Sequence, residues 1–562
     1  MDLKLLIKKW ALHNAMHYDG KANQGAVIGK ILSEHKELKD DVKLLAKDVG
    51  LVIKEISKLS VEQQKKELEK IAPELLIEQK QEQKDDLPEL KNAVKGNVVT
   101  RIPPEPSKYN HIGHALIFLI NYFYAKRYDG KCVLRIEDTN PEKSTKEFLD
   151  AMKEDIAWVG VKWDKEVIAS NDMQKFYDHA EILIKKSKAY VCACSQEKVK
   201  QLREKKKECE CRKNTVDHNL KEWKSMLDKK YKEGERSLRF IGDMKSNNGV
   251  MRDPILFRIS YVKHFLQDNK YHVWPMYDFE NAIEEELCGV THVIRTTEFM
   301  MRAELHNKLR ECFGYKNPEV LEIGRFEVEG AETQGRLIRQ MIEEKKVSGW
   351  DDPRLVTIKA LKRRGFIPET FKELAVKIVG LSRTGTKLDW DIISSVNRKI
   401  LDKKVNRYFF IQDPVEINVE KAPEKKAELK LHPDFVERGK RIFETKGKFY
   451  VTKTDFERFK TGKLYRLMDC LNFVNKKGKF VFDSLEYEKY KDKGDFIMHW
   501  LPVSRDLVNV EIMMPDAKIT KGLAEALVED LKIDDIIQFE RFGFCRLDKK
   551  EKEKITFWFT NK

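Results

Sequence analysis

The sequence predicts a multidomain protein in which an α/β core follows a helical region and precedes an all-β region. Three observations lead to this fold class. A strand, a stiff turn and an apolar helix follow one another at residues 98–127, as in the opening half of a βαβ unit. Helical periodicity covers most of residues 1–95, and short runs of alternating apolar and polar residues begin near Val405. With 562 residues the chain has room for roughly three to four domains.

The composition indicates a folded protein with a polyanionic partner. Apolar residues make up 41% and the net charge is +15, which favours nucleic acid. No stretch approaches the ~20 apolar residues that span a membrane, and the N-terminus lacks the apolar core of a signal peptide. The nine cysteines do not resemble a disulfide framework. We therefore expect a cytoplasmic protein without a membrane segment, and a monomer as the default state.

Residues 1–95 form the expected helical appendage. Helical periodicity is clear in residues 59–79, whereas residues 17–22 and Gln24–Val27 are predicted to interrupt it with a turn. The region is Lys-rich, so two functions stay open: a small RNA-binding appendage or a docking bundle. Residues 79–87 are predicted to be a polar linker.

The strand–turn–helix unit has the features of a phosphate site. Val98 to Ile102 reads as a buried strand, prolines then forbid a helix, and an apolar helix starts near Ile112. The free N–H groups at the start of such a helix suit an anion. His111 and His114 flank Gly113, which would let a flat ring approach the backbone. The alternative is a proline-rich turn with two capping histidines.

Carboxylates follow the next strand. Residues 131–138 read as that strand, so Glu137 and Asp138 fall at its carboxyl end, where open α/β sheets place ligand groups. Helices recur through Tyr190, an α/β pattern returns at residues 251–300, and residues 346–404 are largely helical and basic.

Two Cys-x-Cys pairs interrupt the α/β region. Four thiolates suffice for a tetrahedral structural zinc site, which we predict here. The alternative is four unrelated thiols. The proposed ligands are Cys192, Cys194, Cys209 and Cys211.

Five motifs resemble one protein family. Residues 101–114, which end in His111-Ile112-Gly113-His114, are similar to the ATP-binding motif of class I aminoacyl-tRNA synthetases. Residues 135–141, 274–279, 349–355 and 538–548 narrow the resemblance to the glutamyl/glutaminyl branch. The β-type C-terminal region and the GKANQGAV segment resemble the archaeal glutamyl form.

The resemblance implies a Rossmann-type catalytic domain over residues 96–345, with an acceptor-end insertion at about 185–250. A helical connecting region would cover 346–404, and a β-barrel anticodon-binding region 405–562. The implied activity is ATP-dependent ligation of L-glutamate to tRNA(Glu) through a glutamyl-adenylate, with Mg²⁺. Ligation to tRNA(Gln) stays open as a second activity.

The family's site residues carry over to matching positions. The implied catalytic residues are His111, His114 and Arg336. The implied ATP-binding residues are Pro104, His111, Gly113, His114, Gln334, Gly335 and Arg336. The implied glutamate-binding residues are Arg101, Ser107, Glu137, Tyr277, Asn281 and Arg295.

Arg295 favours glutamate over glutamine. The glutaminyl branch resembles this sequence but lacks this arginine. Charge-assisted hydrogen bonds from a guanidinium to a carboxylate are about twice as strong as hydrogen bonds between neutral groups. A glutamine amide would leave a desolvated cation short of its acceptor. The alternatives are a structural Arg295 and a glutaminyl-tRNA synthetase.

The chain departs from the family at two places. Lys108 stands where the family usually has glycine, which would cost on the order of 1 kcal/mol if that position needs a positive φ. Residues 332–339 lack the Ser and Lys of the second ATP motif. We expect Gly335 to keep this loop flexible, and Arg336 or Arg339 to supply a mobile cation. A catalytically weak tRNA-binding paralogue is the third alternative.

Two segments interleave basic and aromatic residues, at 359–366 and 397–410. We predict that they form a surface for tRNA phosphates, with the barrels binding unpaired anticodon bases.

Overall fold

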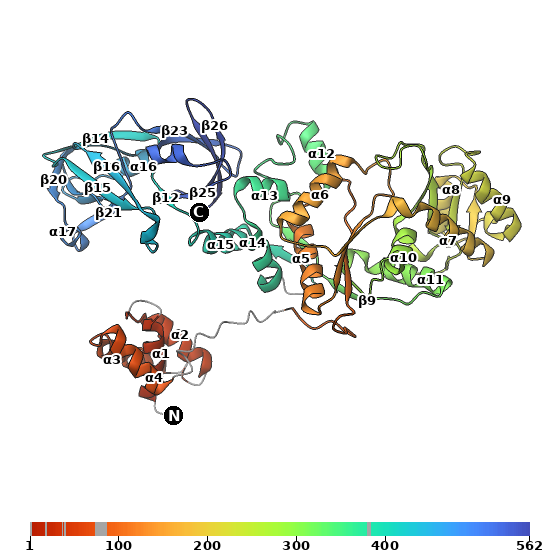
Figure 1. The fold of residues 1–562 in the computed structure, drawn as a ribbon, viewed down its shortest axis with the longest axis horizontal. Coiled ribbons are helices and arrows are strands. Elements are labelled where there is room, and N and C mark those ends of the chain that lie inside the picture. Colours follow the sequence, from red (N-terminus) through yellow and green to blue (C-terminus); the bar gives the residue numbers. More distant parts are fainter. Residues whose placement is uncertain (1–2, 17–19, 36–37, 39–40, 73–86, 379–383) are drawn as a thin grey trace. The chain divides into compact units, whose positions relative to one another are not determined.

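The computed structural model describes residues 3–16, 20–35, 38, 41–72, 87–378 and 384–562 (Figure 1). The chain divides into two compact units, Met1–Asp86 and Leu87–Lys562, which are considered separately. In the described ranges, no helix has the length and apolar character needed to cross a membrane.

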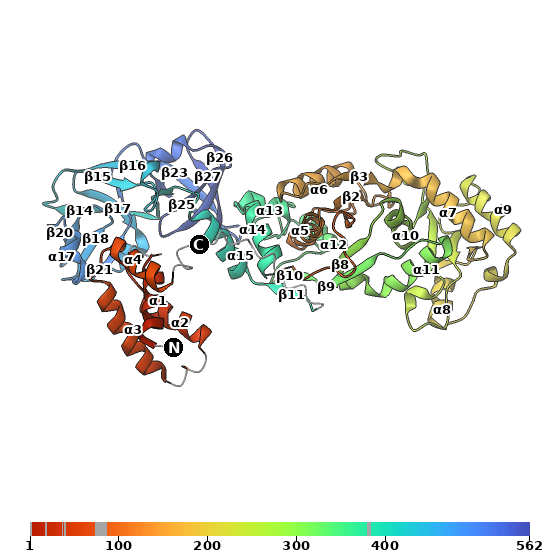
Figure 2. The ribbon, with the colours of Figure 1, turned by 60° about the horizontal axis from the view of Figure 1, so that its bottom comes forward.

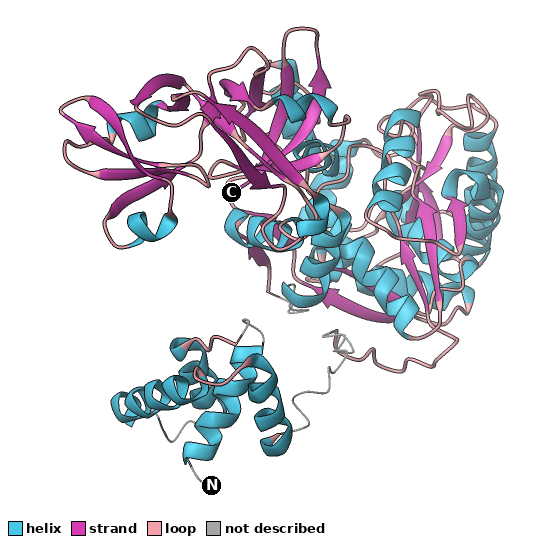
Figure 3. Ribbon diagram, turned by 60° about the vertical axis from the view of Figure 1, so that its left-hand side comes forward, coloured by secondary structure: helices cyan, strands magenta, loops and turns pink. Residues whose placement is uncertain are grey.

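The first unit is a small helical bundle (Figure 3). Its helices are α1 (Leu3–Met16), α2 (Gln24–Glu34), α3 (Val42–Ile56) and α4 (Val61–Ile71). Trp10, Ile31 and Leu68 are among the residues of its core. The turn expected at Gln24–Val27 is wrong, because the side chain of Asn23 accepts a hydrogen bond from the Ala26 amide and caps α2 there. Residues 17–19 and most of the predicted linker lie outside the described residues.

The α/β core contains parallel strands, as predicted. Strands β1 (Val99–Ile102), β2 (Lys131–Ile136) and β3 (Lys165–Ile168) form one sheet, with Val99 opposite Lys131. Strand β8 (His292–Thr296) pairs with β9 (Glu319–Ile323) and continues this layer, since the Thr291 amide donates to the Val99 carbonyl at 3.0 Å. Helix α5 (Ile112–Arg127) buries an apolar face in this core, and α6 (Lys146–Trp158) follows β2.

An antiparallel sheet interrupts the core. It consists of β4 (Ala189–Cys192), β5 (Ser237–Phe240), β6 (Ile255–Ile259) and β7 (Val273–Pro275). Its neighbouring helices are α7 (Met173–Lys185), α8 (Gln196–Glu204) and α9 (Val216–Leu227). The sheet runs past residue 250, the approximate end of the predicted insertion, because β6 pairs with β5 rather than with the parallel strands. The chain then returns through α10 (Tyr277–Leu287) and α11 (Ala303–Phe313).

Helices lead from the core to the C-terminal sheets (Figure 2). They are α12 (Gly335–Glu343), α13 (Ile358–Arg364), α14 (Pro368–Glu373) and α15 (Trp390–Leu401), with a π-helical turn at Leu374–Ile378. Strands β10 (Phe326–Val328) and β11 (Thr386–Leu388) pair in parallel across this region. Helices α13, α14 and α15 lie within residues 346–404, the predicted helical connecting region.

The C-terminal region is all-β, as predicted. One seven-stranded sheet has the order β12-β25-β26-β27-β23-β24-β13 and another has the order β21-β18-β19-β20-β14-β17-β22. The first contains Arg407–Tyr408, Ile536–Phe539, Gly543–Lys550, Ile555–Asn561, Val508–Met513, Ile519–Ala524 and Phe410–Gln412. The second contains Gly494–Met498, Leu464–Leu467, Asn472–Lys476, Lys479–Ser484, Pro414–Glu420, Lys448–Thr452 and Leu501–Pro502. Strands β15 (Lys425–Lys430) and β16 (Lys440–Thr445) form a hairpin, and α16 (Lys453–Glu457) and α17 (Tyr487–Lys491) are short helices.

Candidate active site

The start of α5 holds the two histidines face to face. His111 is the N-cap: its Nδ1 accepts a hydrogen bond from the Gly113 amide at 3.1 Å. Nδ1 of His114 accepts from the His111 amide at 3.3 Å, and the two rings stack with centroids 3.7 Å apart. The Ile112 amide donates to the Val356 carbonyl at 3.0 Å, which fixes the helix start against the segment before α13.

Both imidazoles are neutral hydrogen-bond donors. Because each Nδ1 accepts a backbone N–H, the ring proton is assigned to Nε2. Burial, followed by the charges of Lys108 and Arg325, lowers the pKa of His111 to about 3. Burial also holds the pKa of His114 well below its usual value. The helix start therefore offers two Nε2–H groups but no imidazolium charge.

Little space is left for a side chain at Gly113. A Cβ there would lie 3.0 Å from Cε1 of His111 and 3.1 Å from the carbonyl oxygen of Phe326. The flat ring that lies against this glycine is therefore the imidazole of His111.

The depressed pKa of His111 predicts a pH dependence of stability. Between about pH 6.5 and pH 3 the unfolded chain binds a proton at His111 that the folded chain does not bind. The free energy of unfolding should therefore decrease as the pH is lowered through this window, by up to ~1.4 kcal/mol per pH unit from this group. Urea unfolding from pH 7 to pH 4 should show a shallower fall for His111→Asn, which keeps an N-cap side chain. Equal slopes for the two proteins would contradict a buried neutral His111.

Side chains from three strands meet those of one helix. Arg101, Glu137 and Arg295 come from the carboxyl ends of β1, β2 and β8, and Tyr277 and Asn281 lie on one face of α10. Except for Tyr277, which is partly exposed, all are buried. The structure thus brings these predicted glutamate-binding residues to one edge of the sheet.

Glu285 ties this cluster together. Its Oε1 accepts hydrogen bonds from Nε of Arg101 at 2.9 Å and Nδ2 of Asn281 at 3.1 Å, and Nη2 of Arg135 lies 3.4 Å away. Burial alone would raise the pKa of Glu285, but the guanidinium groups of Arg101, Arg135 and Arg310 outweigh it and lower the pKa to about 2. The carboxylate is therefore ionised and balances two buried arginines.

Glu137 and the loop after β1 complete the cluster. Oε1 of Glu137 accepts a hydrogen bond from Nη2 of Arg135 at 2.6 Å, and its amide donates to the Pro104 carbonyl at 3.0 Å. Burial and the nearby charge of Glu137 raise the pKa of Tyr277, so its hydroxyl stays protonated. Ser107 is buried in the same loop.

The guanidinium of Arg295 is buried, and only some of its nitrogen atoms have a hydrogen-bond partner in the described part of the chain. Its Nη2 lies 3.3 Å from Oε1 of Glu322, its partner across the β8–β9 ladder, and its Nη1 lies 3.5 Å from Nδ1 of His306. Nε of Arg295 is buried and has no hydrogen-bond partner among the described residues. This guanidinium therefore keeps hydrogen-bonding capacity inside the cluster.

Four residues of the cluster were not found from the sequence. Glu285 follows Asn281 by four positions, so helix periodicity alone could have placed it on the same face. Arg135 precedes Glu137 by two positions, on the same side of β2. Glu322 and His306 reach Arg295 from other elements, and no local pattern marks them.

The second nucleotide motif differs from its prediction. Gly335 does not keep a loop flexible: it is buried and is the first residue of α12. Arg339 is not a mobile cation, because its Nη1 donates to the Ser107 carbonyl at 2.7 Å. Gln334 and Arg336 are exposed. Lys108 is not among the residues with a positive φ, so the expected backbone strain is absent.

The four predicted zinc ligands lie together. Their Sγ atoms are all within 4.8 Å of one another, with Cys192 3.9 Å from Cys209 and Cys194 4.0 Å from Cys211. Around a zinc ion with Zn–S bonds of about 2.3 Å, tetrahedral sulfur atoms are ~3.8 Å apart. Nη1 of Arg239 lies 3.7 Å from Sγ of Cys192 and 3.8 Å from that of Cys209, where it would balance thiolate charge.

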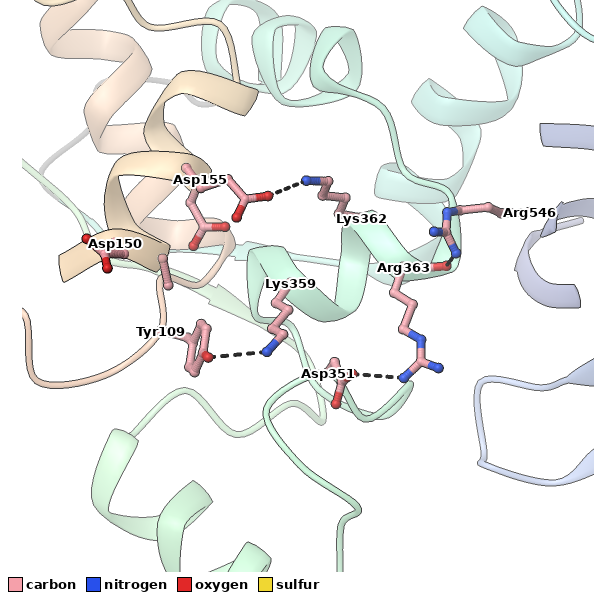
Figure 4. A pocket seen from close by; sticks show the side chains of 10 residues that line it. Tyr109, Asp150, Asp155, Asp351, Lys359, Lys362, Arg363 and Arg546 are labelled. Carbon is pink, nitrogen blue, oxygen red and sulfur yellow. Dashed lines mark hydrogen bonds and ion pairs between the residues drawn. The ribbon is translucent and has the colours of Figure 1, made fainter. Parts of the chain in front are cut away.

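A separate cleft of about 370 Å³ lies between α6, α13 and β26 (Figure 4). There Nζ of Lys359 points to the hydroxyl of Tyr109, at 3.2 Å, and Arg363 points to Asp351, at 2.8 Å. Both carboxylate oxygens of Asp548 also bind Arg363, at 3.0 and 2.8 Å.

The basic segment 359–366 is largely engaged within the chain. Arg363 is paired with acids, and Arg364 is buried and donates to the carbonyls of Pro353 and Thr560. For these two residues we correct the predicted tRNA surface: they hold the C-terminal sheet against α13.

Comparisons with known proteins match successive parts of the chain to the same protein group. A family model described as class I tRNA synthetases (E and Q), catalytic domain, matches residues 97–403. Two models for the anticodon-binding domain of the same group match residues 405–487 and 474–548. The chain is 40% identical to the glutamate–tRNA ligase of Pyrococcus furiosus and 41% identical to that of Thermococcus kodakarensis, each over 100% of both chains. It is 37% identical to that of Methanothermobacter thermautotrophicus over 97% of both chains.

Proposed function

The chain belongs to the class I tRNA synthetases for glutamate and glutamine, and we propose that it joins L-glutamate to the 3′ end of tRNA(Glu) in two ATP-dependent steps. The observation that carries the choice of amino acid is the buried Arg295 guanidinium, whose Nε has no partner within the described residues. A substrate carboxylate would supply the missing acceptor.

The amino acid would bind along α10. Glu137 would hold the substrate ammonium, because one of its carboxylate oxygens has no partner in the described chain. Arg101, Tyr277 and Asn281 would line the pocket, and Arg295 would bind the side-chain carboxylate. Glutamine would place a neutral amide against this guanidinium, and such mismatches can discriminate by ~10⁴-fold or more.

ATP would lie at the start of α5. His111 and His114 would donate their Nε2–H groups to its phosphates, next to the loop that contains Pro104 and Gly113. In the first step a carboxylate oxygen of glutamate attacks the α-phosphorus and pyrophosphate leaves. In the second, the terminal adenosine hydroxyl of tRNA takes the glutamyl group. The cluster holds no activated nucleophile of its own, so catalysis would depend on positioning and charge stabilisation.

Mg²⁺ usually accompanies ATP in this family, and it would neutralise phosphate charge when bound. Such an ion would be held by substrate phosphates, water and one or two carboxylates rather than by a dedicated protein cage.

ATP–pyrophosphate exchange with tRNA(Glu) present tests the proposal. We expect exchange with glutamate and none above background with an equal concentration of glutamine. Exchange with glutamine would indicate a glutaminyl-tRNA synthetase instead. No exchange with either amino acid, together with retained tRNA binding, would indicate a tRNA-binding paralogue.

The C-terminal sheets would bind the anticodon, as in the matched domain models. We propose that tRNA(Glu) is the principal partner of a monomeric enzyme. Charging of tRNA(Gln) transcripts by the same enzyme distinguishes discriminating from non-discriminating charging, because the two tRNAs differ in the third anticodon base.

We also propose a structural zinc at the four cysteines. Their thiolates fit a tetrahedral ion, and Arg239 supplies compensating charge. The ion would join the strand end at Cys192 to the segment after α8.

Elemental analysis should therefore find about one zinc per chain in the purified protein. Cys209→Ser should lose most of this zinc and should lower the melting temperature. Cys312→Ser is the matched control, because Cys312 is a partly buried thiol outside the cluster and should keep the metal. Equal zinc in both variants, or none in the wild type, would contradict the site.

A further inference from the structure

The side chain of Lys108, in the first nucleotide motif, lies against the second motif at Gly335. A Cβ on Gly335 would be 2.8 Å from Cδ of Lys108 and 3.1 Å from its Cβ, so the lysine side chain runs across the start of α12. The preceding residue, Ser107, is tied to the same helix through Arg339. Lys108 and Gly335 therefore fit each other, because the missing Cβ leaves the space that the lysine side chain occupies.

The neighbouring arginines are either engaged by a partner or exposed to solvent. Nε of Arg325 is 2.9 Å from Oε1 of Glu298, and Arg339 donates to the Ser107 carbonyl. Arg336 is exposed. Lys108 is partly buried, and in the described part of the chain no hydrogen bond or ion pair holds its ammonium. Burial lowers the pKa of Lys108, and the carboxylate of Glu105 opposes this effect.

The charge of Lys108 acts on the histidine pair. After burial, it contributes to the lowered pKa of both His111 and His114. The neutral imidazoles donate hydrogen bonds but bring no net charge, and the start of α5 brings only about half a positive charge. A triphosphate at this position would therefore need a full cation. Among the described residues Lys108 is a partly buried cation without a partner beside the histidine pair, whereas Arg336 is exposed.

We propose that Lys108 is a catalytic residue of the first step, where its ammonium binds the β- and γ-phosphates of ATP and stabilises the departing pyrophosphate. This inference rests on the proposed function. An oxygen of the glutamate α-carboxylate forms a bond to the α-phosphorus. The bond from that phosphorus to the bridging oxygen breaks, and its electron pair leaves with pyrophosphate. Lys108 keeps its proton and acts by charge alone.

The contact joins the two places where the sequence departs from the motifs that it resembles. The first motif has Lys108 in place of the usual glycine, and the second has Gly335 where the family's Ser and Lys are missing. The cation thus reaches the phosphates from the first motif, and a small residue in the second gives it room.

The first test replaces the ammonium. In glutamate-dependent ATP–pyrophosphate exchange, Lys108→Met should lower kcat/KM for ATP by about 10²–10³-fold, as for loss of one preorganised charge contact. Lys108→Arg should retain at least ten times the activity of Lys108→Met, because it keeps the charge. Lys345→Met is the matched control: Lys345 is exposed just after α12 and should stay within twofold of the wild type.

The second test moves the ammonium without removing it. Gly335→Ala places a methyl group 2.8 Å from Cδ of Lys108, so that side chain must shift, and activity should fall at least tenfold. In a Lys108→Met background the same change should cost less than twofold. Alanine favours helix over glycine, so a loss of activity would not reflect unfolding of α12, which circular dichroism can verify.

Binding gives a readout that does not depend on turnover. By calorimetry with ATP alone, the Kd should rise at least tenfold in Lys108→Met and stay unchanged in Lys345→Met. If the wild type lacks glutamate-dependent exchange, the proposed function fails. If the wild type is active and Lys108→Met stays within threefold in exchange and in ATP affinity, only the role of Lys108 fails. A larger loss in Arg336→Gln than in Lys108→Met would also overturn it, by assigning the cation to Arg336.

Discussion

Replacing Arg295 by glutamine is expected to lower kcat/KM for glutamate by roughly 10²–10³-fold in ATP–pyrophosphate exchange. The wild-type guanidinium is buried, and its Nε has no partner among the residues that the structure describes. The variant would leave the substrate carboxylate with a neutral donor in a desolvated pocket. The loss should appear in kcat/KM for glutamate. KM for ATP should stay within about twofold, because the histidine pair is separate from Arg295.

Arg505→Gln is the matched control, since Arg505 is an exposed arginine in the loop before β23. It should not change the exchange rate. A second comparison uses Glu322→Gln, which replaces the carboxylate 3.3 Å from Arg295 by a neutral amide. With less competition for the guanidinium, KM for glutamate should fall or stay unchanged. Unaltered glutamate kinetics in Arg295→Gln would remove this residue from the pocket.

The second large effect is on stability. Glu285→Ala should lower the free energy of unfolding of the unit Leu87–Lys562 by about 3–5 kcal/mol. The reason is that Glu285 is the carboxylate shared by Arg101 and Arg135, and all three side chains are almost fully buried. Removing it leaves two buried guanidinium groups short of a counter-charge. Urea unfolding followed by tryptophan fluorescence measures the change.

Two further variants separate charge from packing. Glu285→Gln keeps the size and one acceptor oxygen, so it should cost less than Glu285→Ala. Glu286→Ala changes the adjacent, exposed residue of α10 and should stay within about 0.5 kcal/mol of the wild type. If Glu285→Ala and Glu286→Ala unfold at the same urea concentration, Glu285 does not hold the cluster together.

Local patterns predicted the elements that carry the site. The prolines after β1 and the apolar run from Ile112 mark the start of α5, which the structure places there. The strand before Glu137, the position of Arg295 at the end of β8 and the α10 face shared by Tyr277 and Asn281 follow from simple periodicity. These features depend on residues a few positions apart, which is why the sequence was sufficient.

Contacts between distant segments could not be predicted in this way. The fit of Lys108 over Gly335 joins residues more than two hundred positions apart, and the pairing of Arg295 with Glu322 depends on strand register. The basic residues Arg363 and Arg364 looked like a free surface because their partners, Asp548 and Thr560, lie near the far end of the chain. A charge in a sequence does not reveal whether its counter-charge is supplied by the fold.

The buried guanidinium of Arg295 is proposed to make this enzyme specific for glutamate. The most direct measurement is aminoacylation of a tRNA(Glu) transcript by the wild-type enzyme with labelled glutamate or labelled glutamine at equal concentration. We predict that glutamate is attached to the terminal adenosine and that glutamine charging is at least ~10³-fold slower. Charging with glutamine at a comparable or higher rate would contradict the specificity proposed for Arg295.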